Sequence, residues 1–280
     1  MDRERPGRRG GEERRRAEPA PHRGWVEGGR EGYRERSKER ELVYGVEPVR
    51  ELIAAAPGVI RILYVKDREQ RRFEEEIRRV RASGGQVRTA DDAELARVVG
   101  PSARHQGIVA QTRPYNYTPL EELLAEKHDP LLVVDGVTDP RNLGAILRSA
   151  EGSGARAVII ARDRTAPVTP AAIKASAGAW IHLRIARCGN VANLLRGLKE
   201  DGYWIAALAP GGKTSLYELD VSRRLAIVVG SEERGVRELV RKTADFVVSI
   251  PMRGRIGSLN VSVATAVALF EVARRRATPS

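Results

Sequence analysis

Residues 131–161 have the sequence LLVVDGVTDPRNLGAILRSAEGSGARAVIIA, and this stretch decides the fold class. Leu131–Asp135 and Ala157–Ala161 are short apolar runs, which is typical of strands buried on both faces. Apolar residues recur at helical spacing between them: Leu143, Ile146, Leu147 and Ala150. A strand, a helix and a second strand in this order predict two parallel strands connected by a helix.

The same alternation continues toward the C-terminus. Further strands are predicted at Trp204–Leu208, Leu225–Val229 and Phe246–Ile250. Helices are predicted at Asn142–Gly152, Ala171–Ala179, Val191–Asp201, Arg234–Thr243 and Leu259–Arg276. We therefore expect an α/β domain with a mostly parallel sheet covered on both faces. Ligands of such sheets bind beyond the carboxyl ends of the strands.

A smaller α/β unit precedes this domain. Strands are predicted at Val59–Val65, Gln86–Thr89 and Gly107–Ala110, with helices at Arg68–Arg81 and Asp91–Val98. Residues 113–128 contain two prolines and one short helical pattern, so they are interpreted as a linker. The expected organisation is a small domain at 41–112, the linker, and a larger domain at 129–280.

Residues 1–40 have a different composition. They contain thirteen Lys and Arg, nine acids and no Leu, Ile or Phe. Such a segment buries too little apolar surface to offset its ordering entropy, so we expect a disordered basic extension. It could contact RNA phosphates or serve as a solubilising tail, and the sequence leaves both open.

The overall composition limits the class of protein. A net charge of +12 points to an anionic partner, with nucleic acid ahead of an acidic membrane. One cysteine, Cys188, excludes a disulfide framework and a Cys-rich zinc site, and fits a reducing cytosol. No stretch reaches eighteen apolar residues. We expect a cytoplasmic protein without membrane or metal.

The first of three loops that follow strands runs through residues 134–148. Arg148 is predicted to lie off the apolar face of its helix, one turn beyond Gly144. Helical side chains lean toward the N-terminus, so its guanidinium is expected to pass over the bare glycine toward the strand ends. An ordinary surface arginine is the alternative. The dinucleotide pattern G-x-G-x-x-G is absent from this loop.

The other two loops are IVVGSEERG, residues 227–235, and IPMRGRIGSLNVS, residues 250–262. Gly230 would allow a ligand to approach the backbone closely. Glu232 fits either a functional role or a helix-start carboxylate. Ser258 or Asn260 can cap the following helix, but two such residues exceed what one cap needs. Residues 256–270 carry no charge, so that helix must bury more than one face, against its sheet and a second subunit.

At these loops the sequence resembles the SpoU (TrmH-like) 2′-O-ribose methyltransferases of the SPOUT superfamily. The matching stretches are DPRNLGAILRSAEGSGA, IVVGSEERG and IPMRGRIGSLNVSVATAVALFE, in the order and spacing of the family. The resemblance covers Asp129–Arg276. More weakly, VYGVEPVRELI and HQGIVA resemble the small substrate-binding domain of the RlmB branch.

The resemblance implies an active site and a topology. The implied catalytic residues are Arg148, Glu232, Ser258, Asn260 and Asn142. The implied cofactor is S-adenosylmethionine, held by backbone groups around Gly230, Ile250 and Leu259, with Leu208 and Ala209 at the pocket edge. A homodimer and a C-terminal trefoil knot are also implied. The knot departs from the general rule that chains do not thread loops, so hydrophobic pattern alone would not have suggested it.

The implied chemistry suits these residue types. A ribose 2′-hydroxyl is a poor nucleophile that needs positioning and stabilisation of its developing alkoxide. Arg148 would supply a fixed positive charge for the alkoxide and the adjacent phosphate, since guanidinium is not deprotonated in proteins. Asn260, Ser258 and Glu232 would orient the sugar and Arg148. The group that takes the proton stays open.

Other functions are weighed against this one. A dehydrogenase or kinase-like enzyme is disfavoured by the absence of both glycine-rich phosphate motifs, and a covalent cysteine mechanism because Cys188 lies outside all three loops. The basic charge alone would also suit a non-catalytic RNA-binding ribosome-assembly factor. Among methylation targets, the RlmB-like first domain favours a guanosine in 23S rRNA. A transfer RNA guanosine and a resistance-type ribosomal adenosine remain alternatives.

Overall fold

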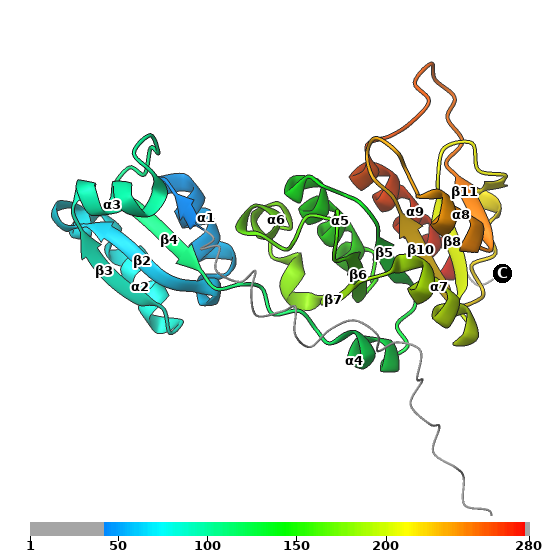
Figure 1. The fold of residues 1–280 in the computed structure, drawn as a ribbon, viewed down its shortest axis with the longest axis horizontal. Coiled ribbons are helices and arrows are strands. Elements are labelled where there is room, and N and C mark those ends of the chain that lie inside the picture. Colours follow the sequence, from blue (N-terminus) through cyan, green and yellow to red (C-terminus); the bar gives the residue numbers. More distant parts are fainter. Residues whose placement is uncertain (1–41, 278–280) are drawn as a thin grey trace, which may run out of the picture.

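The computed structural model describes residues 42–277, which form two sheets connected by a linker (Figure 1). The prediction of a disordered extension at 1–40 lies outside the described residues. Within the described part of the chain, no helix is long and apolar enough to cross a membrane.

The first sheet has four strands in the order β1-β4-β2-β3. Its strands are β1 (Leu42–Tyr44), β2 (Ile60–Lys66), β3 (Gln86–Ala90) and β4 (Ile108–Thr112), and its helices are α1 (Val46–Ala55), α2 (Glu74–Ala82) and α3 (Asp92–Val99). β4 is antiparallel to β1 and β2, whereas β2 and β3 are parallel. Apolar residues of α1 and α2 pack on one face, and Leu95 of α3 packs on the other.

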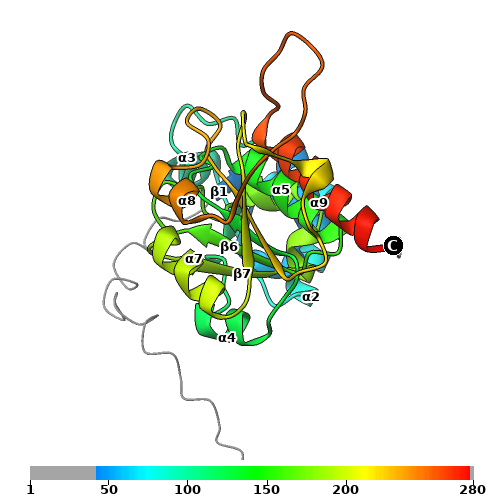
Figure 2. The ribbon, with the colours of Figure 1, turned by 90° about the vertical axis from the view of Figure 1, so that its right-hand side faces the viewer.

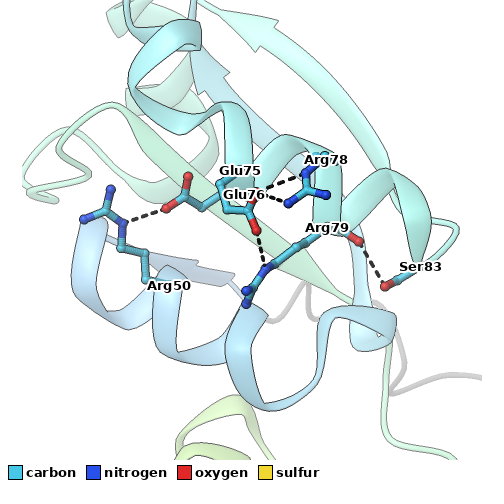
Figure 3. A network of polar contacts seen from close by, with 6 residues as sticks. All are labelled: Arg50, Glu75, Glu76, Arg78, Arg79 and Ser83. Carbon is cyan, nitrogen blue, oxygen red and sulfur yellow. Dashed lines mark hydrogen bonds and ion pairs between the residues drawn. The ribbon is translucent and has the colours of Figure 1, made fainter.

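The helix predicted at Arg68–Arg81 is shorter than expected. Residues Asp67–Phe73 form 3-10 turns, and α2 begins only at Glu74. Figure 3 shows that Arg78 and Arg79 both bond to Glu75, whose pKa is lowered chiefly by the hydrogen bond from Arg78. Arg50 of α1 donates from Nε to Glu76 at 2.6 Å. Glu75 thus pairs with two arginines of its own helix, whereas Glu76 pairs with an arginine of α1.

The second sheet has seven strands in the order β7-β6-β5-β10-β8-β11-β9. They are β5 (Leu131–Val134), β6 (Ala157–Ala161), β7 (Arg184–Cys188), β8 (Trp204–Leu208), β9 (Thr214–Ser215), β10 (Leu225–Val229) and β11 (Phe246–Ser249). All six pairings are parallel. The predicted α/β fold with a mostly parallel sheet is confirmed.

Helices cover both faces of this sheet (Figure 2). They are α4 (Leu120–Ala125), α5 (Pro140–Gly152), α6 (Pro170–Ala175), α7 (Val191–Glu200), α8 (Glu238–Thr243) and α9 (Val261–Ala277). Alternate strand residues enter opposite cores: Leu132 packs with α5, α6 and α9, whereas Leu131 packs with α4, α7 and α8. This explains the continuous apolar runs, because each central strand is buried on both sides.

In this second unit, the largest differences from the prediction concern two strands and two helix ends. β7 and β9 were not predicted. α8 begins at Glu238 instead of Arg234, since residues 230–237 form a loop in which Ser231 and Gly235 exchange backbone hydrogen bonds of 3.0 Å. α6 ends at Ala175, and a separate 3-10 turn covers Ala179–His182.

The last turn of α9 is tied to the segment that enters β10. Arg275 donates to the carbonyl of Leu219, and Arg276 donates to those of Val221 and Arg223, at 2.6 to 2.9 Å. Arg276 also forms an ion pair of 2.9 Å with Asp129, which lies just before β5. Asp129 and Arg276 lie at the start and the end of the part of the chain that forms the second sheet and its helices, and they are in direct contact.

The linker runs beside β7, the edge strand of the second sheet. The backbone N–H of Thr118 donates to the carbonyl of Ile185 at 2.8 Å. The hydroxyl of Tyr117 accepts a hydrogen bond of 2.9 Å from the N–H of Val168. The linker is thus fixed along the sheet edge by its own hydrogen bonds.

Candidate active site

A pocket of about 280 Å³ lies at the carboxyl ends of β10, β8 and β11. These strands are neighbours and parallel, so the loops that follow them meet at one edge of the sheet. All five residues predicted to hold the cofactor line this pocket: Leu208, Ala209, Gly230, Ile250 and Leu259. Two of the predicted catalytic residues, Glu232 and Ser258, line it as well.

Gly230 is required by the close approach of two backbone segments. A Cβ at this position would lie 2.1 Å from the carbonyl carbon of Gly235, far inside van der Waals contact. The loop between them folds back on itself through the paired hydrogen bonds of Ser231 and Gly235. The glycine predicted to admit a ligand therefore also admits the protein's own backbone.

Three predicted catalytic residues are connected by hydrogen bonds. The amide Nδ2 of Asn142 donates to Glu232 Oε1 at 2.8 Å, and Nδ2 of Asn260 donates to Asn142 Oδ1 at 3.2 Å. Asn260 Oδ1 accepts from the backbone N–H of Ser262 at 2.8 Å. Asn260 thus serves as a helix cap and also contacts the site, whereas no helix-capping bond is formed by Ser258 among the described residues.

Arg148 takes no part in these hydrogen bonds. Its side chain on α5 is exposed, it does not line the pocket, and among residues 42–277 it forms no hydrogen bond or ion pair. The predicted path over a bare Gly144 is wrong. A Cβ on that glycine would lie 2.4 Å from the carbonyl oxygen of Ala172, because α6 packs directly on it.

An ion pair between a buried carboxylate and a half-exposed arginine was not predicted from the sequence. Asp135 follows β5, its side chain is only 3% exposed, and both of its oxygens accept hydrogen bonds of 2.7 Å from Arg237. The pair attaches the start of α8 to the end of β5. An acid directly after a buried strand and an arginine at a helix start are the only signals that could have indicated it.

Cys188 is buried in β7, away from the pocket. Burial raises the pKa of its thiol to about 12, with a smaller contribution from the charge of Asp135. A thiol with such a pKa is almost entirely protonated near neutral pH and is a poor nucleophile. Among the described residues, no group of three or more His, Cys, Asp and Glu side chains is placed to hold a metal ion.

Comparisons with known proteins agree with this fold and site. Residues 129–270 match the SpoU rRNA methylase family, and residues 42–118 match the substrate-binding family of RNA 2′-O ribose methyltransferases. The 23S rRNA (guanosine-2′-O-)-methyltransferase RlmB of Escherichia coli K12 is 39% identical over 241 residues, which cover 84% of this chain and 99% of that protein. RlmB of Photorhabdus laumondii is 41% identical, covering 84% and 98%.

A solved relative shows the same architecture. The AdoMet-bound rRNA methyltransferase of Sinorhizobium meliloti is 25% identical, with a TM-score of 0.62 over 85% of this chain and 88% of that one. Fold, site and relatives together define an S-adenosylmethionine-dependent RNA 2′-O-ribose methyltransferase. The chain belongs to the SpoU rRNA methylase family.

Proposed function

We propose that this chain transfers a methyl group from S-adenosylmethionine to the 2′-hydroxyl of a guanosine in 23S rRNA, in the cytoplasm. The single observation that carries the proposal is the hydrogen-bonded series Glu232, Asn142 and Asn260, which connects all three loops beside one pocket. The target is supported by the two RlmB relatives, which are named for this guanosine methylation.

The pocket residues fit the cofactor. Leu208, Ile250 and Leu259 offer apolar walls for a flat heterocycle, and carboxylates of Glu232 and Glu233 suit a positively charged ligand. Gly230 and Ala209 add backbone groups without side-chain bulk. The sulfonium of S-adenosylmethionine supplies an activated methyl group when it is bound.

The remaining site residues act on the acceptor ribose. Arg148 is the electrostatic group: its exposed guanidinium, which pairs with no acid among the described residues, binds the adjacent phosphate and stabilises the developing alkoxide. Asn142, Glu232 and Asn260 hold one another and orient the sugar. Ser258, at the pocket wall, completes this set. Arg148 and Glu232 are the charged residues of this set, and the asparagines and Ser258 are neutral. The two charges therefore set the electrostatic field at the ribose.

We infer a division of labour along the chain. Residues 129–280 perform the transfer, and residues 41–112 select the RNA through base or shape contacts, which typically involve unpaired loops. Residues 113–128 connect them. The family match at 42–118 supports this assignment. The C-terminal trefoil knot is part of the same proposal, and the return of α9 across the sheet to pack on α5 is consistent with it.

A homodimer through α9 and its neighbours is also proposed. Ile256, Val263 and Phe270 are 73%, 48% and 50% exposed. They belong to the segment 250–277, whose first part projects as a loop from the body of the second unit in Figure 1. Apolar side chains grouped on one segment favour burial against a second copy.

Methyl mapping tests the function. Purified full-length chain is incubated with labelled S-adenosylmethionine and either 23S rRNA or transfer RNA, and the modified nucleotide is mapped. A single 2′-O-methylguanosine in 23S rRNA is expected. Modification of transfer RNA or of an adenosine would support the alternative targets. RNA binding without any transfer would support a non-catalytic assembly factor.

A further inference from the structure

A second pocket, of about 300 Å³, lies where the linker passes the carboxyl end of β7. Its walls include Tyr115 and Tyr117 of the linker, Arg162 after β6, and Arg187 and Gly189 at the end of β7. None of these residues belongs to the methyl-transfer pocket. The pocket therefore combines two arginines and two tyrosines from three separate parts of the chain.

Neither arginine of this pocket is neutralised. Arg187 stacks on the ring of Tyr117 at 4.3 Å, and its Nε is buried without a hydrogen-bond partner. Arg162 is exposed, and Nη2 of its guanidinium would lie only 3.0 Å from a Cβ on Gly189, so the glycine makes room for it. Among residues 42–277, neither Arg162 nor Arg187 forms an ion pair.

Arg184 on the same strand provides the contrast. It pairs with both Glu122 and Glu126 of the α4 region. Among the described residues, two acids pair with Arg184 at the start of β7, and none pairs with Arg187 near its end. Two cations that share a pocket without a carboxylate favour an anion from outside, and a guanidinium matches the oxygens of a phosphate.

The position of this pocket relates it to the methyl-transfer site. β7, β6, β5 and β10 are consecutive and parallel, so Arg162, Gly189 and Gly230 all follow strand ends at one edge of the sheet. Three strand spacings separate β7 from β10, which is about 14 Å. An RNA strand could cover that distance with a few nucleotides.

We propose that Arg162 and Arg187 bind a backbone phosphate of the RNA substrate, a few nucleotides away from the methylated ribose. The inference rests on the proposed function, since it concerns the substrate of that reaction. The linker takes part directly, because Tyr117 supports the guanidinium of Arg187. Its role is then to complete a substrate site and not only to connect two units.

The test uses the full chain, a 23S rRNA transcript and four variants: Arg162→Gln, Arg187→Gln, the double variant and the control Arg196→Gln. Arg196 is exposed on α7, and its one side-chain hydrogen bond within residues 42–277 is to Asn193, so the control removes one charge elsewhere. RNA affinity is measured by filter binding at several salt concentrations, independently of methyl transfer. Calorimetric affinity for S-adenosylmethionine and the melting temperature report whether each variant is intact.

Each single variant is expected to raise the KM for RNA about tenfold and to change kcat less than about twofold, because one charge-assisted hydrogen bond is lost. The slope of log affinity against log salt is expected to fall by about 0.7 per lost contact. Arg187→Lys should keep the slope. Should Arg187→Gln melt early, Arg162→Gln decides, because the Arg162 side chain has no hydrogen-bond or ion-pair partner within residues 42–277 to lose.

Affinities and salt slopes of Arg162→Gln equal to those of Arg196→Gln would overturn the inference while leaving the proposed function in place. Conversely, if the wild-type chain methylates no RNA, the proposed function fails. The salt slopes still report on the phosphate site in that case.

Discussion

Asn142 donates a hydrogen bond of 2.8 Å to Glu232, although 90 positions separate the two residues in the chain. The bond connects the start of α5 to the loop after β10. It forms because β10 pairs directly with β5, which brings the loops after these two strands together. Asn142 also accepts a bond from Asn260, so this one amide joins all three loops of the candidate site.

Asn142→Ala is expected to reduce methyl transfer about 100-fold while changing the affinity for S-adenosylmethionine less than about twofold. The substitution removes both amide contacts but no residue of the pocket wall. Transfer of labelled methyl and calorimetric affinity are measured together. Asn193→Ala, which replaces an exposed asparagine on α7, should behave as wild type. A variant with full activity would show that the series has no role in catalysis.

Arg148→Ala is expected to lower methyl transfer about 1,000-fold without changing cofactor affinity, because the guanidinium lies outside the pocket. Arg148→Lys should also be poor, since an ammonium lacks the planar fork. Arg156→Ala is the control. Arg156 is an exposed arginine just before β6, at the amino end of that strand, whereas the candidate site lies at the carboxyl ends of the strands. Near wild-type turnover of the alanine variant would remove Arg148 from the mechanism.

Gly230→Ala is expected to abolish binding of S-adenosylmethionine and to lower the free energy of unfolding by about 1–3 kcal/mol, as overpacking does. The added Cβ meets the backbone of Gly235, which cannot rotate away as a side chain could. Gly58→Ala is the control, because nothing lies within 4 Å of a Cβ there. Calorimetry and urea denaturation measure the two effects. Unchanged cofactor affinity would contradict the prediction.

Cys188→Ala is expected to keep methyl transfer, and the native thiol should not react with Ellman's reagent at pH 8 until the protein is denatured. Burial holds the thiol pKa near 12, above its ordinary value of 9.0. The stabilisation from the neutral thiol is therefore complete below pH 9 and is lost as the pH rises toward 12. Loss of transfer with intact cofactor binding would instead indicate a thiol nucleophile.

Val263→Glu is expected to convert a dimer of about twice the 30.8 kDa chain mass into a monomer, because it places a charge among exposed apolar side chains of α9. Leu239→Glu is the control, since Leu239 is exposed to a similar extent on α8. Sedimentation equilibrium at micromolar concentration measures the mass. A wild-type chain that is monomeric and active would refute the proposed dimer.

The sequence predicted best where local pattern and burial agree. The strands at 157–161, 204–208 and 225–229 have the predicted bounds, because each is a continuous apolar run buried on both faces. β7 was missed because Arg184 and Arg187 interrupt its apolar residues, as an edge strand permits. Local hydrophobic periodicity does not indicate which strand lies at the edge of a sheet, where charged residues are tolerated.

The site could be predicted only in part. The resemblance named five cofactor residues from three separate stretches of the chain, and all five line one pocket. The bonds from Asn142 to Glu232 and Asn260 depend on the lateral order of strands, which hydrophobic periodicity does not contain. The packing of α6 on Gly144 is likewise a contact between distant segments. For this reason the expected path of Arg148 was wrong.

The contact between Arg276 and Asp129 has a consequence for biosynthesis. Asp129 leaves the ribosomal exit tunnel long before Arg276 does, and Arg275 and Arg276 fasten the segment that leads into the central strand β10. Until Arg275 and Arg276 have emerged, the carbonyls of residues 219, 221 and 223 and the carboxylate of Asp129 lack these arginine partners. The large sheet therefore acquires this fastening only when residue 276 emerges, after all of its strands have been synthesised.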